Sequence, residues 1–169
     1  MKPSILVALM LCTAVVACTK EPLMTQGIQA PRASGGAGAG LQLTVSAKAA
    51  VLSVTWKNAG ASAIRVPTHV FAGEKHFDWL KVTLTDGRGA KRTLSFRDNR
   101  DESGAVFVDL APGASATETI DLAAWAARAA NGGKALTSGR YDADVVYDTA
   151  SERRGWTGRL EARTTVDIP

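Results

Sequence analysis

The feature that most constrains this chain is a period-two alternation of apolar and polar residues that begins at Leu41. Leu41, Leu43 and Val45 alternate with polar residues, and the same pattern returns over residues 52–56 and 80–84. Successive side chains of a β-strand point to opposite faces of its sheet, whereas a helix needs apolar residues three and four positions apart. The chain from Leu41 onward is therefore predicted to consist of strands with one buried face.

Turn residues separate these strands at short intervals. Asn58-Ala59-Gly60, Asp86-Gly87 and Pro112-Gly113 supply the residue types that tight turns require. The predicted strands cover residues 41–45, 52–56, 63–66, 80–84, 91–97, 106–110, 117–122, 141–147 and 164–168. About seven to nine short strands at this spacing predict an all-β fold, an immunoglobulin-like antiparallel β-sandwich over residues 41–169.

One short helix is expected within this pattern. Asp121 is a suitable N-cap, Leu122, Trp125 and Ala129 fall on one helical face, and Asn131-Gly132 supplies a stop. The helix is predicted to lie between the strand that ends near residue 122 and the strand that begins near residue 141.

The amino-terminal residues predict a secretory signal. Lys2 precedes an apolar run from Ile5 to Ala17, which is shorter than the about 20 apolar residues of a membrane-spanning helix. Val15-Val16-Ala17-Cys18 resembles the lipobox of bacterial lipoproteins. The resemblance implies cleavage between Ala17 and Cys18 and acylation of Cys18, and Thr19 in place of Asp resembles the outer-membrane sorting case. Several acyl chains on one residue anchor a protein stably.

Residues 18–40 are predicted to form the lipidated Cys and a flexible tether, with residues 1–17 as the signal peptide. This stretch has no hydrophobic period, contains two Pro and ends in a Gly/Ala run. As a flexible coil it reaches roughly 25 Å, from about 5–6 Å times the square root of its length. Its glycines follow no predicted strand and lack a Lys-Ser/Thr partner, so we interpret them as linker residues and not as a phosphate loop.

Several motifs of the domain resemble those of small immunoglobulin-like domains in bacterial proteins. They are Leu110-Ala-Pro-Gly-Ala-Ser115, Thr119-Ile-Asp-Leu122, Ser138-Gly-Arg-Tyr141 and the later Gly155-Trp-Thr-Gly-Arg-Leu160. Two families are similar in these motifs, the amino-terminal domain of deuterolysin-like metallopeptidases and the bacterial intracellular proteinase inhibitor. The motifs are structural and imply a fold, since they shape turns and place Tyr141 inward. The His-Glu-x-x-His helix of the metallopeptidases has no counterpart in the sequence, so their activity is not carried over.

Four residues form a weak candidate metal site. Glu74, His76 and Asp78 alternate, so on an extended strand they would share one face, and His69 lies nearby in the sequence. The alternative is a polar loop with solvated charges, and this alternative is favoured because no other Cys or His of the domain completes a ligand set. We expect no metal and no cofactor.

Other polar clusters favour ordinary surface roles. Residues 98–104 are acidic but include an Arg and lack the alternation of a calcium loop. The basic pairs Lys91-Arg92 and Arg153-Arg154 are expected on the solvent face or against anionic lipid heads. The chain has 20 basic and 16 acidic residues, interspersed, which does not favour nucleic-acid binding. The four Trp are expected to be core or half-buried residues.

These observations predict a lipid-anchored lipoprotein of the bacterial cell envelope, sorted to the outer membrane. No Ser lies in a Gly-x-Ser-x-Gly elbow, and with Cys12 removed and Cys18 lipidated no thiol remains for a Cys–His pair. We therefore expect a non-enzymatic binding or accessory module that contacts an envelope protein, with no small-molecule substrate. The alternative is a protease inhibitor of the periplasm or cell surface, for which no inhibitory loop is assigned from the sequence.

Overall fold

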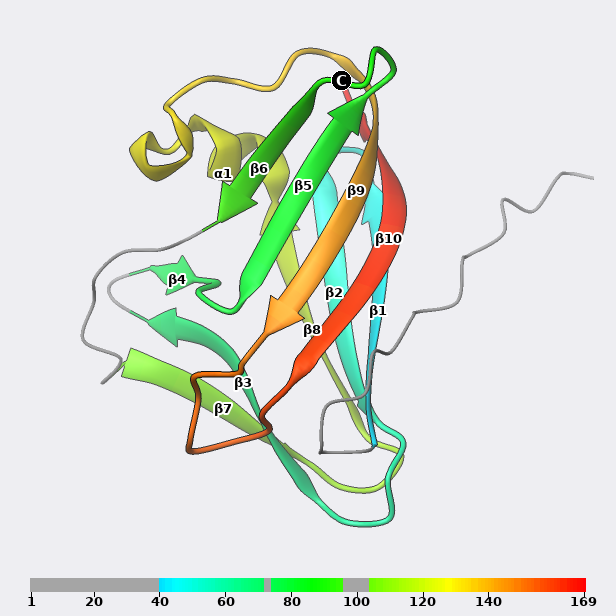
Figure 1. Cartoon of the computed structure of the whole chain (residues 1–169), viewed down its shortest axis with the longest axis vertical. Coiled ribbons are helices and arrows are strands. Elements are labelled where there is room, and N and C mark those ends of the chain that lie inside the picture. The colour runs from blue at the N-terminus through cyan, green and yellow to red at the C-terminus, as the bar shows by residue number, and fades with distance from the viewer. Residues whose placement is uncertain (1–39, 72–73, 96–103) are drawn as a thin grey trace, which may run out of the picture.

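A computed structural model describes residues 40–71, 74–95 and 104–169 (Figure 1). Within these ranges lie ten strands, the short helix α1 and a 3₁₀ turn at Ala129–Asn131. The strands are β1 (Leu41–Lys48), β2 (Val51–Asn58), β3 (Ile64–Phe71), β4 (Lys75–His76), β5 (Leu80–Asp86), β6 (Lys91–Ser95), β7 (Ala105–Leu110), β8 (Ser115–Asp121), β9 (Gly139–Asp148) and β10 (Arg159–Ile168). The structure confirms an all-β fold, and the number of strands exceeds the predicted range because the two-residue β4 is included.

The strands form an antiparallel sandwich. One layer has the order β10-β9-β5-β6 and the other has the order β1-β2-β8, with β1 lying beside β10 (Figure 1). A third sheet, of order β4-β3-β7, continues from β2 and β8 through the turns at one end of the molecule. The loop between β9 and β10 lies toward the same end (Figure 1).

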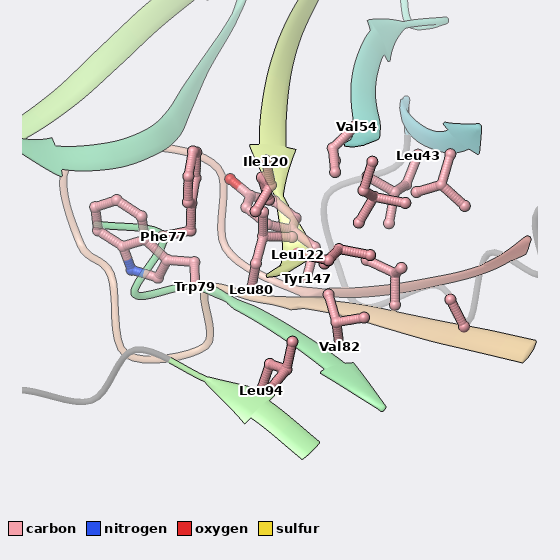
Figure 2. Packing of buried hydrophobic residues seen from close by; sticks show 14 of the residues in the cluster. Leu43, Val54, Phe77, Trp79, Leu80, Val82, Leu94, Ile120, Leu122 and Tyr147 are labelled. Atoms are coloured by element: carbon pink, nitrogen blue, oxygen red, sulfur yellow. The ribbon is translucent and has the colours of Figure 1, made fainter. Parts of the chain in front are cut away.

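The predicted alternation places the core between the two layers. Leu43 pairs with Trp56 and Val45 pairs with Val54 across β1 and β2, and all four side chains are buried. Figure 2 shows Leu43 and Val54 within the buried cluster. Burial of each such aliphatic side chain contributes about 1.5–3 kcal/mol. The opposite layer supplies its own buried set, Leu80, Val82, Leu84, Leu94, Ala143, Val145 and Tyr147.

Aromatic side chains fill the centre of this core. Trp56 meets Tyr147 edge-to-face at 5.3 Å between ring centroids, and the hydroxyl of Tyr147 donates to the carbonyl of Pro67 at 2.6 Å. Burial raises the pKa of Tyr147 well above its usual value, with Glu152 adding to the effect. Trp56, Trp79, Trp125 and Trp156 are all buried, which confirms their prediction as core residues.

Asn58 joins two chain reversals at one end of the sandwich. Its buried side-chain amide donates to the carbonyls of Ser62 and Leu110, both at 2.8 Å, and its side-chain oxygen accepts from the N–H of Gly60 at 2.9 Å. The backbone of Asn58 also bonds to Gly113 and Ala114 of the β7–β8 turn. One side chain therefore fixes the β2–β3 turn against the end of β7.

The predicted helix begins at its predicted cap but is shorter than expected. Helix α1 covers Leu122–Ala127, and the carboxylate of Asp121 accepts from the N–H of Ala124 at 3.0 Å. Arg128 then adopts an extended conformation, so Ala129 begins a separate 3₁₀ turn, Ala129–Asn131, and is exposed. Gly132 ends that turn in the left-handed region, as the prediction of a stop at this position requires.

Two strands are considerably longer than predicted. Pro67 was expected to close a strand, yet β3 continues to Phe71 through a register shift between Pro67 and His69. The strand tolerates this proline because Pro67 lies at a bulge, where its missing N–H does not remove a hydrogen bond between strands. Its carbonyl accepts a hydrogen bond from the hydroxyl of Tyr147. The last strand begins at Arg159 and not at Thr164, because β10 pairs with the whole length of β9.

Candidate functional site

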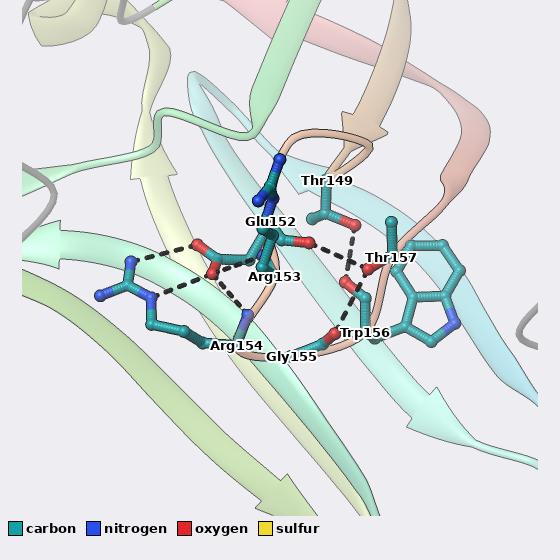
Figure 3. A network of polar contacts seen from close by, with 7 residues as sticks. All are labelled: Thr149, Glu152, Arg153, Arg154, Gly155, Trp156 and Thr157. Carbon is teal, nitrogen blue, oxygen red and sulfur yellow. Dashed lines mark hydrogen bonds and ion pairs between the residues drawn. The ribbon is translucent and has the colours of Figure 1, made fainter.

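The most organised polar surface of the described residues is the loop of residues 149–158 between β9 and β10 (Figure 3). The side chain of Glu152 is 2 % exposed and lies at the centre of this loop. One of its oxygens accepts from the N–H groups of Arg153 and Arg154, at 2.9 and 2.8 Å, and from Nε of Arg154 at 3.0 Å. The other accepts from a terminal guanidinium nitrogen of Arg154 at 3.2 Å.

The environment of Glu152 keeps its carboxylate charged. The hydrogen bond from the Arg154 side chain is the largest cause of a lowered pKa, and it outweighs the desolvation that acts in the opposite direction. Carboxylates that accept several hydrogen bonds stay ionised well into acid. Glu152 is therefore an internal anion that fixes the course of the loop, and its own oxygens are occupied.

Two threonines close the loop around this carboxylate. The hydroxyl of Thr149 donates to the carbonyl of Trp156 at 2.8 Å and accepts from the N–H of Gly158 at 3.1 Å. The hydroxyl of Thr157 donates to the carbonyl of Glu152 at 3.0 Å (Figure 3). The two hydroxyl groups thus supply hydrogen bonds to backbone N–H and C=O groups that would otherwise be paired with a neighbouring strand.

The loop is fixed to β3 at Gly155 and Trp156. The N–H of Trp156 donates to the carbonyl of Arg65 at 2.6 Å, and its indole ring stacks on Tyr147 with 5.9 Å between centroids and 15° between planes. A Cβ at position 155 would lie 2.8 Å from the same Arg65 carbonyl, so only Gly allows this close approach. Trp156 thus attaches the loop both to β3 and to the core.

Outside this attachment the loop and β3 present arginines. The guanidinium carbons of Arg65 and Arg154 lie 4.9 and 5.2 Å from the centroid of the Phe107 ring on β7. Arg153 is exposed, and no described carboxylate forms an ion pair with its side chain. We call Arg65, Phe107, Arg153 and Arg154 the arginine face. Cations held over an aromatic ring in this way keep a defined orientation toward solvent.

A cavity of about 810 Å³ adjoins the loop on the outer side of the four-stranded sheet. Its lining includes Lys81, Asp148, Ser151 and Arg159, and a second hollow of about 700 Å³ along the same sheet shares Lys81 and Arg159. Charges of both signs line these hollows. Such a surface suits contacts with a polar partner and offers little apolar area to a small ligand.

The four weak metal candidates do not converge. His69 Nδ1 lies 3.2 Å from a Glu118 carboxylate oxygen, and Lys75 Nζ lies 2.7 Å from the other oxygen. Glu74 contacts other groups. One of its carboxylate oxygens lies 2.9 Å from a guanidinium nitrogen of Arg128, and the other lies 3.7 Å from Nε2 of His76.

Asp78 lines the cavity beside the loop instead. In the three described ranges, no group of three His, Cys, Asp or Glu side chains is arranged to hold a metal ion. The expected shared face of Glu74, His76 and Asp78 does not form, because β4 covers only Lys75–His76 and His76 is buried while Glu74 is exposed.

His69 is a buried imidazole between β3 and β8. Desolvation is the main cause that lowers its pKa, and Glu118 opposes that shift. Its Nδ1 also lies 3.1 Å from the hydroxyl of Thr68. These contacts join β3 to β8 and explain His69 as a structural residue.

The predicted processing site, Ala17 and Cys18, lies outside the described residues, as do residues 98–103 of the acidic loop. One basic pair is only partly as expected: Lys91 is exposed, but Arg92 is half-buried and donates to the carbonyls of Ala126 at 2.7 Å and Lys134 at 2.6 Å. Arg92 therefore holds the chain that follows α1 and is not free on the solvent face.

Glu152 is the site residue that sequence reasoning missed. The Gly155-to-Leu160 motif indicates a structural role, but an acid beside two arginines also occurs on ordinary surfaces, so the sequence contains no strong signal for the burial of Glu152. Among the described residues, no helix is long and apolar enough to cross a membrane. Comparisons with protein-family models and with curated proteins give no match to this chain.

Proposed function

We propose that this protein is a lipid-anchored lipoprotein of the bacterial envelope, held at the outer membrane by acyl chains on Cys18, and that its sandwich is a non-enzymatic binding module. The observation that carries the proposal is the fixed 149–158 loop with its exposed arginines. A surface that is already ordered loses little conformational entropy when a protein partner binds. Arginine and aromatic residues are also enriched among the residues that dominate binding energy at protein interfaces.

The anchor follows from the lipobox-like junction and the composition of residues 18–40. The tether of roughly 25 Å keeps the domain close to the bilayer and lets it turn toward an envelope protein. Metabolic labelling with palmitate tests this part. We expect label on the wild-type chain and none on Cys18→Ala, and an unlabelled wild type or a labelled variant contradicts the anchoring.

The binding surface is tested by exchanging one charge on the arginine face. Arg153→Glu changes an exposed side chain whose backbone contacts to Glu152 remain. Arg88→Glu, in the turn between β5 and β6 at the opposite end of the molecule, is the matched control (Figure 1). After cross-linking in envelopes and purification, the same partner should be recovered with the wild type and Arg88→Glu but not with Arg153→Glu. Equal recovery with all three proteins contradicts a role of this face.

The second candidate function is protease inhibition at the cell surface or in the periplasm. The observation that favours it is the exposure of Ser151 and Arg153 on a loop whose base is fixed by Glu152, because a preformed loop enters a protease cleft at low entropic cost. A panel of secreted and periplasmic proteases at micromolar protein is the test. Inhibition of an arginine-specific protease that Arg153→Ala abolishes supports it, and a panel without inhibition refutes it.

A further inference from the structure

Strand β7 forms an open edge of the β4-β3-β7 sheet. It has β3 on one side, and no described strand pairs with its other side (Figure 1). Residues Ala105–Val108 are all half-exposed, and none of them is charged or a proline. Natural sheets usually protect an edge with charged residues, proline, a bulge or a covering segment. The first four residues of this edge lack such protection and Asp109 is the one charged residue of β7, so the edge is suited to pairing with another strand.

The direction of the backbone groups follows from two hydrogen bonds on β3. The carbonyl of Arg65 accepts from the N–H of Trp156, and the carbonyl of Pro67 accepts from the hydroxyl of Tyr147, both at 2.6 Å. Neither donor belongs to β7. The backbone polar groups of Arg65 and Pro67 consequently point away from β7.

Their cross-strand partners must then point outward. Arg65 is opposite Asp109 and Pro67 is opposite Phe107. In an antiparallel pair, opposing residues either exchange both backbone bonds or direct both sets of groups away from each other. The N–H and C=O groups of Phe107 and Asp109 thus face the open side, two residues apart, as a neighbouring strand requires. No turn, loop or cap hydrogen bond within the described part of the chain reaches them.

We propose that β7 is a dimerisation edge to which β7 of a second copy adds as an antiparallel strand. Symmetric pairing of the outward groups allows Phe107 to oppose Asp109 of the other copy, Phe107 to oppose Phe107, or Asp109 to oppose Asp109. The second register brings together the arginines that flank both rings, the third brings together the two carboxylates, and like charges oppose both. The first register places Asp109 of each copy beside Phe107 of the other, where Arg65 and Arg154 lie 4.9 and 5.2 Å from the ring centroid. Charge complementarity therefore selects a second copy in the first register.

This register places Val108 opposite itself on the two-fold axis. The backbone groups of Val108 point toward β3, so the two Val108 residues form a pair without mutual backbone bonds, in which Cα atoms lie about 4.5 Å apart. Cysteines at such a position meet the geometry of a disulfide. The pairing adds an intermolecular strand contact that goes beyond the proposed binding of an envelope protein, and it does not depend on acylation of Cys18.

The test is disulfide cross-linking of the full chain in cells, on non-reducing gels of whole-cell protein, which detect the chain whether or not it is anchored. Val108→Cys should give a reducible band at twice the monomer mass. The matched control, Thr44→Cys on the exposed face of β1, should give only the background of the wild-type chain, which carries Cys12 and Cys18. Adding Asp109→Lys to Val108→Cys should abolish the dimer, because lysine then faces Arg65 and Arg154 of the other copy.

A second variant separates loss of the edge from loss of the fold. Asp109→Pro removes the outward N–H of Asp109 and leaves the bonds between β7 and β3 in place, so it should also abolish the dimer while preserving the unfolding transition. Val108→Cys that cross-links no more than Thr44→Cys overturns the proposal, as does a dimer that survives Asp109→Lys. A cross-linked band of any other mass assigns the edge to a different protein and equally overturns it.

Discussion

Replacement of Glu152 gives the most direct test of how the 149–158 loop is held. Glu152→Ala leaves the N–H groups of Arg153 and Arg154 without their acceptor, at about 1 kcal/mol for each lost bond. The Arg154 side chain is 47 % exposed, so solvent reduces its ion pair to at most about 1 kcal/mol. The expected loss in the free energy of unfolding is about 2–3 kcal/mol for Glu152→Ala. Glu152→Gln keeps one acceptor oxygen and should lose about 1 kcal/mol.

Urea unfolding followed by tryptophan fluorescence measures these losses, and hydrogen exchange of the Arg153 and Arg154 amides locates them. Glu161→Ala is the matched control because Glu161 is exposed and pairs with Arg159 at 2.8 Å, which predicts a change below about 0.5 kcal/mol. Glu152→Ala with no greater effect than the control, or with unchanged exchange of both amides, would refute the reasoning.

The same residue predicts a dependence on pH. The folded pKa of Glu152 lies below its usual 4.5, so the unfolded chain binds more protons in acid. The stabilisation from its charge is complete above 4.5 and is lost as the pH falls through the folded pKa. The difference in unfolding free energy between wild type and Glu152→Gln should therefore shrink below pH 4.5. A difference that stays constant to lower pH contradicts the assigned role of the charge.

Three further predictions concern the core and its ends. Tyr147→Phe removes the buried bond to Pro67 and should lower the unfolding free energy by about 1–3 kcal/mol in urea, since the carbonyl is left unpaired. Burial lowers the pKa of His69 below 6.5, so wild-type stability should fall as the pH drops through 6.5, and His69→Gln should flatten that slope in unfolding curves at successive pH values. Asp121→Ala should cost about 1 kcal/mol and Asp121→Asn much less, measured by thermal unfolding, and equal losses would contradict the N-cap.

The sandwich could be predicted from the sequence because its core follows a repeating local pattern. Apart from Asn58, the buried side chains of β1 and β2 are the alternating apolar residues, and Asp121 caps α1 as its side chain and position require. Period-two burial is encoded in each strand separately, so no knowledge of distant contacts is needed.

The strand ends and the candidate site depend on contacts between distant residues. Pro67 remains inside β3 because Tyr147, 80 positions later, bonds to its carbonyl. Glu152 becomes a buried anion because the N–H of Trp156 bonds to Arg65 and fixes the loop, in which the side chain of Arg154 then bonds to the carboxylate of Glu152. A local pattern contains neither contact. The weak metal candidates lie apart for a related reason, since His69 pairs with Glu118 on β8.

The bonds of Asn58 also bear on how fast this domain can fold. The amide of Asn58 bonds to Leu110, 52 positions away, and β2 pairs with β8 over a comparable separation. Closing a chain loop of that length costs entropy before the contact repays it, so such topologies fold in milliseconds to seconds. The hairpin of β1 and β2 can form early, but its outer strand β8 joins only after β3 to β7 have been synthesised and arranged. We therefore expect the rate of folding to be limited by the step that brings the β2–β3 turn to the β7–β8 turn, which the side chain and backbone of Asn58 then hold together.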